Sequence, residues 1–160
     1  MLLVPMTDSE FERFSKRSVA DYAAEKVRSG EWSESESLAQ AEASFRSLLP
    51  DGRRTEHHWF LVLRIGAQQT AVGSLWYASQ IRANQPVAYV YDIYIDPEHR
   101  REGHAVAALN ALDLVAQGQG LGGVALHVFG HNSAARALYE RMGYSTTNIH
   151  MFKPVSRAES

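Results

Sequence analysis

The chain has 160 residues, of which 45% are hydrophobic and 21% charged, and these fractions are typical of a folded globular protein. Sixteen Lys and Arg residues against eighteen Asp and Glu residues give a formal net charge of −2, which favours neither a nucleic-acid nor an anionic-membrane partner. Cysteine is absent, which excludes disulfides, thiolate metal ligands and Cys nucleophiles. The apolar runs are too short to span a membrane and the N-terminus lacks a secretory pattern, so we expect a cytoplasmic domain that acts on a small molecule.

Two helices are predicted in the first third of the chain. Residues 7–10 have the spacing of a capping box, and the helix that they begin is expected to end at Gly30. Residues 33–36 repeat this spacing at the start of a second helix, which residues 50–52 (Pro-Asp-Gly) end. In both segments the apolar residues recur every three or four positions, as one face of a helix requires.

Strands are predicted next, followed by alternating helix and strand. Residues 58–65 and 70–78 are expected to be antiparallel strands, and residues 87–95 (VAYVYDIYI) are the strongest strand of the sequence because they are rich in β-branched and aromatic residues. The remaining predictions are a helix, a strand, a helix and a final strand, at residues 103–117, 123–129, 132–142 and 145–152. The polar residues 154–160 are expected to fray, and the whole chain 1–160 is expected to be one domain.

The segment between residues 87–95 and the following helix carries the chemical information. Pro97 ends the strand, Arg100 and Arg101 supply positive charge, and Gly103 begins the helix. The first N–H groups of a helix are unpaired, and together with the helix dipole they favour an anion such as phosphate. Glycine at 103 lets a diphosphate approach the backbone without a Cβ in the way. The alternative is an ordinary strand-to-helix connection with two solvated arginines.

Two motifs resemble landmarks of a known family. Arg100-x-x-Gly103-x-Ala105 resembles the cofactor loop of the GNAT superfamily of acyl-CoA-dependent N-acetyltransferases. The segment NSAARALYERMGY, from Asn132 to Tyr144, resembles the N-x-x-A-x-x-L-Y-x-x-x-G-F/Y segment of the same superfamily. The resemblance implies an α/β (α+β) GNAT fold, with a mixed, mostly antiparallel central sheet flanked by helices, in a branch of small bacterial proteins.

The resemblance further implies acetyl-CoA as co-substrate. The backbone of Ile93, Tyr94 and Ile95 would pair with the pantetheine arm, and the Asn132 side chain would contact the cofactor. The diphosphate would lie on the N–H groups of six consecutive residues, with Arg100 beside them: Arg101, Glu102, Gly103, His104, Ala105 and Val106. A small or aliphatic residue is commoner in the family at position 104, but only the backbone there needs to reach phosphate.

Acetyl transfer to an amine needs a base and an acid. An amine with a pKa of about 10.4 is neutral in only about one molecule per thousand near pH 7, so a base, a negative site or a desolvating pocket must remove its proton. The candidates for the base are Asp92, which alternates with Tyr94 on one face of its strand, and His127, at a strand position where some family members carry a catalytic Glu. Tyr139 stands where the family often has the acid that protonates the departing thiolate. The alternatives are a solvated Asp92 and a packed His127.

Two further patterns are set aside. Residues 118–123 match G-x-G-x-x-G, but a helix precedes and a strand follows them, which is the reverse of a dinucleotide loop. His127 and His131 have a zinc-like spacing that places two ligands on one face only in a helix, whereas a strand is predicted there. The sequence therefore predicts neither a nucleotide loop nor a metal site.

The resulting hypothesis is an N-acetyltransferase that acts on a small-molecule or peptide amine and forms no acyl-cysteine intermediate, because the chain has no cysteine. No nucleic-acid or membrane partner is expected, and a homodimer remains open. One rival is a non-catalytic acyl-CoA-binding sensor with the same fold, and another is an enzyme that uses a different acyl-CoA.

Overall fold

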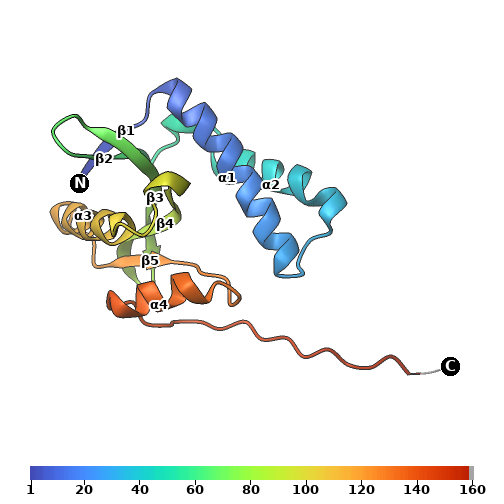
Figure 1. The fold of residues 1–160 in the computed structure, drawn as a ribbon. Helices are drawn as coiled ribbons and strands as arrows, with labels where there is room; N and C mark the ends of the chain where they lie inside the picture. Colours follow the sequence, from blue (N-terminus) through green and yellow to red (C-terminus); the bar gives the residue numbers. More distant parts are fainter. Residues whose placement is uncertain (159–160) are drawn as a thin grey trace. The chain divides into compact units, whose positions relative to one another are not determined.

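The computed structural model describes residues 1–158, whose contacts divide into a first unit of residues 1–129 and a second unit that begins at Gly130. The elements of the first unit (Figure 1) are β1 (Leu2–Pro5), α1 (Asp8–Arg28), α2 (Glu34–Leu48), η1 (Gly52–Arg54), β2 (His58–Ile65), β3 (Thr70–Arg82), β4 (Gln85–Ile95), η2 (Pro97–His99), α3 (His104–Gly118) and β5 (Val124–Leu126). The second unit contains α4 (Ser133–Arg141). Residues 159–160 of the predicted frayed tail lie outside the described residues.

The first unit is built on one sheet with the strand order β1-β2-β3-β4-β5. The first three neighbouring pairs are antiparallel, whereas β4 and β5 are parallel. The parallel pair follows from the chain path, because α3 lies between β4 and β5 and provides the crossover that a parallel pair needs. This mixed, mostly antiparallel sheet confirms the predicted fold class.

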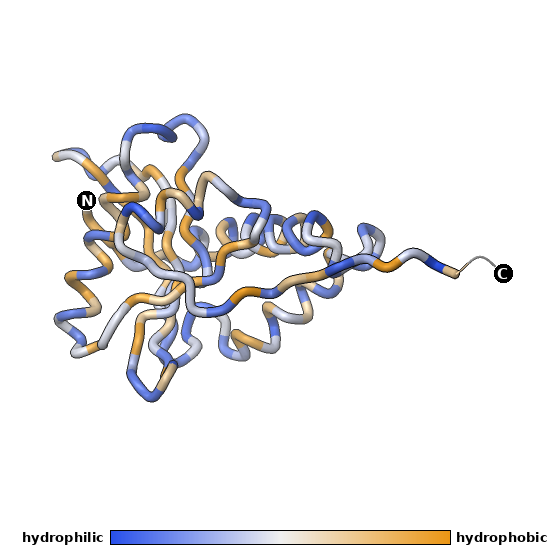
Figure 2. Tube along the Cα trace, turned by 90° about the horizontal axis from the view of Figure 1, so that it is seen from below, coloured by the Kyte–Doolittle hydropathy of each residue, from blue (hydrophilic) through white to orange (hydrophobic). Residues whose placement is uncertain are grey.

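Helices pack against both faces of the sheet. On one face, Ala108, Leu112 and Ala116 of α3 share a buried core with side chains of β2, β3 and β4. On the other face, Phe14 of α1 and Leu49, directly after α2, belong to a second core with β2 and β3 side chains. Figure 2 shows hydrophobic and hydrophilic residues alternating along the chain, with several turns hydrophilic. Within residues 1–158, no helix combines the length and the apolar character that a membrane span needs.

Both predicted N-terminal helices are present, but only one has the predicted cap. The Thr7 hydroxyl accepts a hydrogen bond from the Glu10 N–H at 3.2 Å, and the Glu10 carboxylate accepts one from the Thr7 N–H at 3.0 Å. Ser33 begins α2, as expected, but its side chain makes no capping bond and lies 3.4 Å from the hydroxyl of Ser35. The second capping box is therefore wrong, although the helix begins where it was predicted.

The hairpin of β3 and β4 is longer than predicted. Ala83 and Asn84 have φ values of 48° and 64°, which is the pair of positive values that a type I′ turn requires. This two-residue turn matches the twist of the flanking strands, so pairing continues to Arg82 opposite Gln85.

Other strand predictions need correction. β1 was not predicted, because four residues at a sheet edge are too short for a periodic signal. β5 comprises only residues 124–126 instead of 123–129, and within the described chain residues 145–152 form no strand. The segment predicted as the final strand has no partner strand within the second unit, and three of its apolar side chains are 69–89% exposed: Ile149, Met151 and Phe152.

Candidate functional site

β4 contains a bulge opposite Trp76. Trp76 pairs with Asp92, and the neighbouring pair skips Tyr91, so Tyr91 is the extra residue. Because side chains alternate along a strand, one extra residue places Tyr91 and Asp92 on the same face, the face that α1 covers. Ile93 and Ile95 then pack on the α3 face.

The pairing between β4 and β5 ends at Val90. β5 pairs with β4 only at residues 88–90 and ends at Leu126, whereas β4 stays paired with β3 as far as Ile95. Residues 91–95 therefore present one edge without a neighbouring strand in the described sheet. Such an edge offers N–H and C=O groups to an extended polar chain. The predicted pantetheine-binding residues 93–95 all lie on it.

Gly73 of β3 sets the distance between β3 and this part of β4. A Cβ built at Gly73 would lie 2.1 Å from the carbonyl oxygen of Tyr94, which is far inside van der Waals contact. Glycine is therefore required here by close backbone approach, and it fixes the position of the β4 edge relative to the rest of the sheet.

The loop after β4 exposes a run of backbone N–H groups. Arg101 and Gly103 have φ values of 64° and 80°, and this left-handed backbone directs the chain into α3. The N–H groups of residues 101–106 donate no hydrogen bond to any acceptor within residues 1–158. Nothing lies within 4 Å of a Cβ built at Gly103, so its φ, and not crowding within the protein, makes glycine the favoured residue.

Arg100 acts on β4 as well as on the loop. Its Nε donates a hydrogen bond to the carbonyl oxygen of Ile95 at 2.9 Å, and its guanidinium lies 5.2 Å from the centroid of the Tyr94 ring. The guanidinium of Arg17 lies 3.8 Å from the centroid of the same ring. The side chains of Arg17 and Arg100 therefore both contact the end of β4. Arg101 is exposed and belongs to the run of residues whose N–H groups are free.

Asp92 forms an ion pair with a residue that the sequence analysis missed. Nη2 of Arg17 lies 2.5 Å from Oδ2 of Asp92, and Nη1 lies 2.8 Å from the carboxylate of Asp21, one helical turn further along α1. Burial raises the pKa of Asp92, and the charge and hydrogen bond of Arg17 oppose this effect. Because only 20% of the Asp92 side chain is exposed, the solvated alternative is wrong.

His58 is a second residue whose position was missed. Trp76 donates its Nε1–H to Nδ1 of His58 at 3.0 Å, which leaves the imidazole proton on Nε2. Burial lowers the pKa of His58, which favours the neutral form of the ring. Tyr91 stacks on Trp76 with ring centroids 4.6 Å apart, and its hydroxyl accepts a hydrogen bond from Gln80. An aromatic wall thus lies on the same face of the sheet as Asp92.

Comparison with known proteins decides the family. Residues 21–144 match the model of the acetyltransferase (GNAT) family. The chain belongs to the GNAT acetyltransferase family. It is 35% identical over 153 residues to "Uncharacterized N-acetyltransferase YycN" of Bacillus subtilis, with 96% of this chain and 97% of that protein covered. It is 36% identical over 151 residues to YdgE of the same organism, also named an N-acetyltransferase, with 94% and 96% covered.

Solved structures agree with this GNAT assignment. The crystal structure of YycN superposes with a TM-score of 0.91 at 35% identity, and the alignment covers 98% of this chain and 99% of that one. The structure named "Putative acetyl transferase from Pyrococcus furiosus" gives a TM-score of 0.70 at 24% identity, with 96% of this chain and 99% of that one covered, and this likeness concerns the fold alone. The family resemblance of the two motifs is therefore confirmed.

The structure of this GNAT chain places His127 outside the predicted strand. β5 ends at Leu126, where it separates from β4, so His127 lies one residue beyond the strand. Its side chain is exposed. Its ring meets that of Phe129 edge-on at 4.8 Å. A hydrogen bond from Lys26 lowers the pKa of Glu31, and His127 adds a smaller contribution in the same direction, which places His127 near the turn between α1 and α2. Its role as a base stays a prediction.

The second GNAT motif lies in the second unit and is described there by itself. Oδ1 of Asn132 accepts a hydrogen bond from the Ala135 N–H at 3.2 Å and so caps α4. Gly143, with a φ of 96°, ends the helix, where the Tyr144 N–H donates to the carbonyl oxygen of Tyr139 at 3.0 Å. Part of the motif therefore specifies the helix ends. The predicted cofactor contact of Asn132 and the acid role of Tyr139 stay predictions.

Proposed function

We propose that this GNAT chain is an N-acetyltransferase that transfers the acetyl group of acetyl-CoA directly to a primary amine of a small molecule, peptide or protein. One observation carries the proposal: the free edge of β4 at residues 91–95 leads straight into the loop whose N–H groups at 101–106 have no acceptor in the described chain. An open strand edge suits an extended amide-containing arm, and unpaired N–H groups at a helix start suit a diphosphate.

The residues present suit acetyl-CoA, which supplies a thioester and a thiolate leaving group when bound. The backbone of residues 93–95 would bind the pantetheine arm, and the N–H groups of residues 101–106 would bind the diphosphate with Arg101 beside them. A Cβ at Gly103 would meet nothing within 4 Å, so the space in front of this backbone is open. N–H groups of the bulged strand at Tyr91 would stabilise the oxyanion of the tetrahedral intermediate.

Asp92 and His127 remain the two candidates for removing the proton of the amine. Burial raises the pKa of Asp92, which makes it a stronger base than an exposed carboxylate, but its Oδ2 is already paired with Arg17. His127 is exposed at the point where β5 ends. An ordered water could link either group to the amine.

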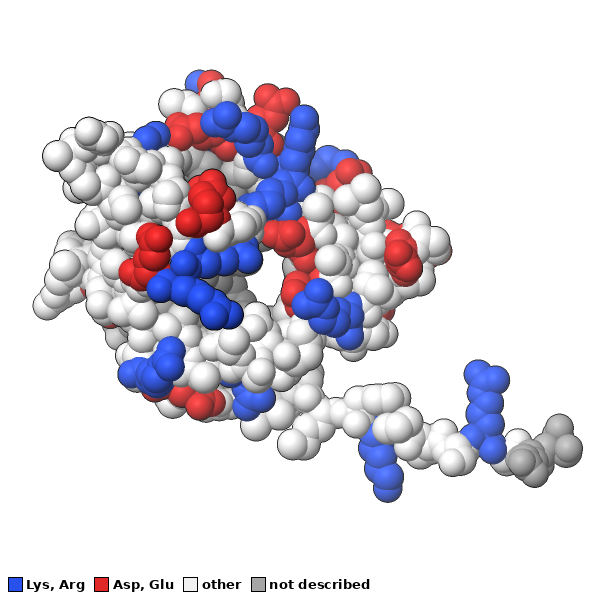
Figure 3. All heavy atoms as spheres, in the orientation of Figure 1, with Lys and Arg blue, Asp and Glu red and all other residues white. Residues whose placement is uncertain are grey.

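Charge on the surface fits a small acceptor better than a polyanion. Figure 3 shows basic side chains next to acidic ones over the face in view, with no broad surface of one sign. The ion pairs Lys26–Glu31 and Arg53–Asp8 illustrate this mixing. A nucleic-acid partner requires a continuous positive surface, and the face in view has no such surface. This mixing of charges supports our proposal that the chain has no nucleic-acid partner.

The proposal is tested by incubating the protein with acetyl-CoA and a panel of amines and following thiol release with a colorimetric reagent. The chain has no cysteine, so the protein contributes no background. We expect one class of amine to stimulate release well above hydrolysis, and CoA to raise the melting temperature. Stabilisation by CoA without amine-dependent release would indicate the non-catalytic acyl-CoA-binding module, an alternative that the pairing of Asp92 with Arg17 favours. No stabilisation at all would exclude both functions.

Replacing Tyr139 by Phe is expected to lower kcat by about a hundred-fold or more while leaving CoA affinity nearly unchanged, because the change removes only the proton that the departing thiolate would take. Steady-state kinetics and calorimetric titration with CoA measure the two effects separately. Tyr144→Phe is the matched control, since its ring lies 5.6 Å from that of Tyr139 in the same motif. Equal losses of turnover and affinity in Tyr139→Phe would show that the tyrosine is structural.

A further inference from the structure

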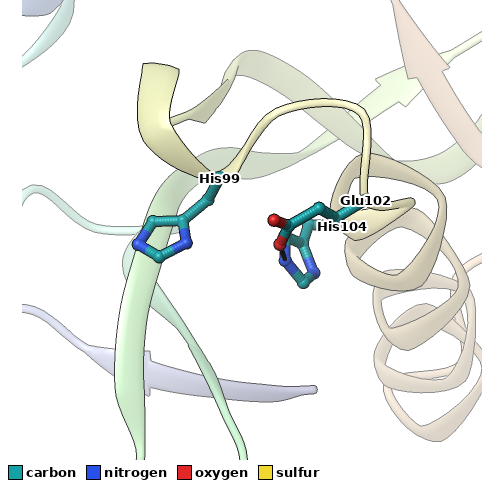
Figure 4. A group of neighbouring side chains, drawn as sticks. All are labelled: His99, Glu102 and His104. Carbon is teal, nitrogen blue, oxygen red and sulfur yellow. Dashed lines mark hydrogen bonds and ion pairs between the residues drawn. The ribbon is translucent and has the colours of Figure 1, made fainter.

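Three side chains that can bind metal meet at the loop between β4 and α3. One ligand atom each from His99, Glu102 and His104 can be chosen so that all lie within 4.8 Å of one another. Nε2 of His104 lies 2.9 Å from a carboxylate oxygen of Glu102, and the rings of His99 and His104 are 6.4 Å apart between centroids. Figure 4 shows Glu102 and His104 joined, with His99 across a gap from them.

The backbone of the loop brings these residues together. The spacing H-x-x-E-x-H matches neither the helical nor the strand period, so no regular element would place the three side chains on one face. The left-handed conformations of Arg101 and Gly103 fold the chain so that residues on both sides of them meet. The side chain of His104 is only 13% exposed, which restricts its rotamers and pre-organises the group.

The proposed acetyl transfer does not use the side chains of His99, Glu102 and His104. A diphosphate on the loop would use the N–H groups of Glu102 and His104, not the carboxylate or the imidazole. The nearest other titratable residues along the chain are Glu98, Arg100 and Arg101, and the Nε of Arg100 is already bound to the carbonyl oxygen of Ile95. Within the cluster itself, the carboxylate of Glu102 is the negative charge that would balance a cation placed between the two rings.

We propose that His99, Glu102 and His104 form a binding site for Zn²⁺ or a chemically similar transition-metal ion. Two imidazole nitrogens and one carboxylate oxygen form a donor set that suits Zn²⁺, whereas Mg²⁺ and Ca²⁺ prefer oxygen ligands alone. The inference goes beyond the proposed acetyl transfer and does not depend on it. It also departs from the sequence prediction of no metal site, which weighed only the pair His127 and His131.

The geometry needs only small side-chain movements to hold such an ion. Tetrahedral Zn²⁺ with bonds of about 2.0–2.1 Å places its ligand atoms roughly 3.3 Å apart. His104 and Glu102 would open slightly from 2.9 Å, and His99 would turn toward them from within 4.8 Å. The Glu102 side chain is 54% exposed and free to adjust. Three protein ligands leave a fourth position for water or for an oxygen of an anion.

The test is a calorimetric titration of untagged protein with ZnCl₂. We expect one ion per chain, and we expect His99→Gln and Glu102→Gln each to weaken the affinity by about ten-fold or more. His57→Gln and Glu98→Gln are the matched controls, because each changes an exposed residue of the same type outside the site, and both should bind as the wild type does. MgCl₂ should give no binding heat, and Co²⁺ should give the intense visible absorption of a tetrahedral complex.

Two results would overturn the metal site. One is the absence of Zn²⁺ binding by the wild type, and the other is an equal affinity in the site variants and the control variants. Glu102→Gln preserves the shape of an exposed side chain, and its melting temperature without metal shows whether the fold is intact. Because the titration uses metal alone, failure of this site would leave the acetyltransferase proposal standing, and the reverse is also true.

Discussion

Replacing Gly103 by aspartate is expected to weaken CoA binding by about a hundred-fold or more, which corresponds to about 2.7 kcal/mol. Two effects add. The φ of 80° at Gly103 disfavours any residue with a Cβ by about 1–2 kcal/mol, so the free loop would relax away from the conformation that presents its N–H groups, and CoA binding would have to restore it. The new carboxylate would also stand among the N–H groups proposed to bind the diphosphate, where it repels the phosphate charges and competes for their donors. Calorimetric titration with CoA measures the loss.

Two controls separate charge from strain and local effects from general ones. Gly103→Asn adds a side chain of nearly the same size without charge, and asparagine tolerates left-handed backbone better than most residues, so its loss of affinity should be smaller. Gly120 follows the other end of α3, has a φ of 70° and has open space around its Cβ position, so Gly120→Asp should bind CoA normally. Wild-type affinity in Gly103→Asp would show that the loop does not bind the diphosphate.

Replacing Arg17 by methionine is expected to destabilise the protein by about 2–4 kcal/mol at pH 7, because it leaves the Asp92 carboxylate without its cation in a site that is four-fifths buried. The loss should depend on pH. The pKa of Asp92 is raised in the folded state, so the folded protein holds a proton there at pH values where the unfolded chain has lost it. The contribution of Asp92 to the free energy of unfolding is therefore fully present below the ordinary pKa of 3.8. It is lost as the pH rises through the raised pKa of the folded state.

Arg17 opposes the rise that burial causes in the pKa of Asp92, so the pKa of Asp92 should rise further in Arg17→Met. The destabilisation should therefore be small near pH 4, where Asp92 can hold its proton, and large near pH 7. Urea unfolding across this range gives the free energy of unfolding for each variant. Arg28→Met on the same helix removes an arginine that is 63% exposed and should cost no more than about 0.5 kcal/mol. The double variant Arg17→Met/Asp92→Asn should lose the added pH dependence. A destabilisation equal at both ends of the range would contradict the burial of a charged Asp92.

The sequence predicted the elements that rest on strong local signals. The capping box at Thr7 begins α1, and the glycine at 103 begins α3. The sequence also contains a signal for the bulge in β4 that the sequence analysis did not use. Ala88 and Val90 face α3, and so do Ile93 and Ile95, so the step from Val90 to Ile93 is three residues instead of two. That odd step breaks the alternation and indicates the bulge at Tyr91.

Arg17 could also have been found. It lies three residues after the core residue Phe14 and four before Asp21, so a charged side chain stands at the margin of the apolar face of α1. Its pairing with Asp92, 75 residues away, depends on tertiary packing and has no local signal. The cluster of His99, Glu102 and His104 depends on two left-handed residues, of which Arg101 is a type that seldom adopts this conformation. Contacts of this kind can be identified in the structure but cannot be predicted from the periodicity of the sequence.

The close approach at Gly73 limits how this sequence can diverge. Any other residue would bring a Cβ to 2.1 Å from the Tyr94 carbonyl oxygen, so it could be accepted only if β3 moved away from β4 at the free edge. A descendant of this chain with a side chain at position 73 would therefore have a rebuilt edge, and an extended arm would no longer lie in the same place. The residue at position 73 therefore indicates whether a related chain has kept the strand geometry beneath the proposed site.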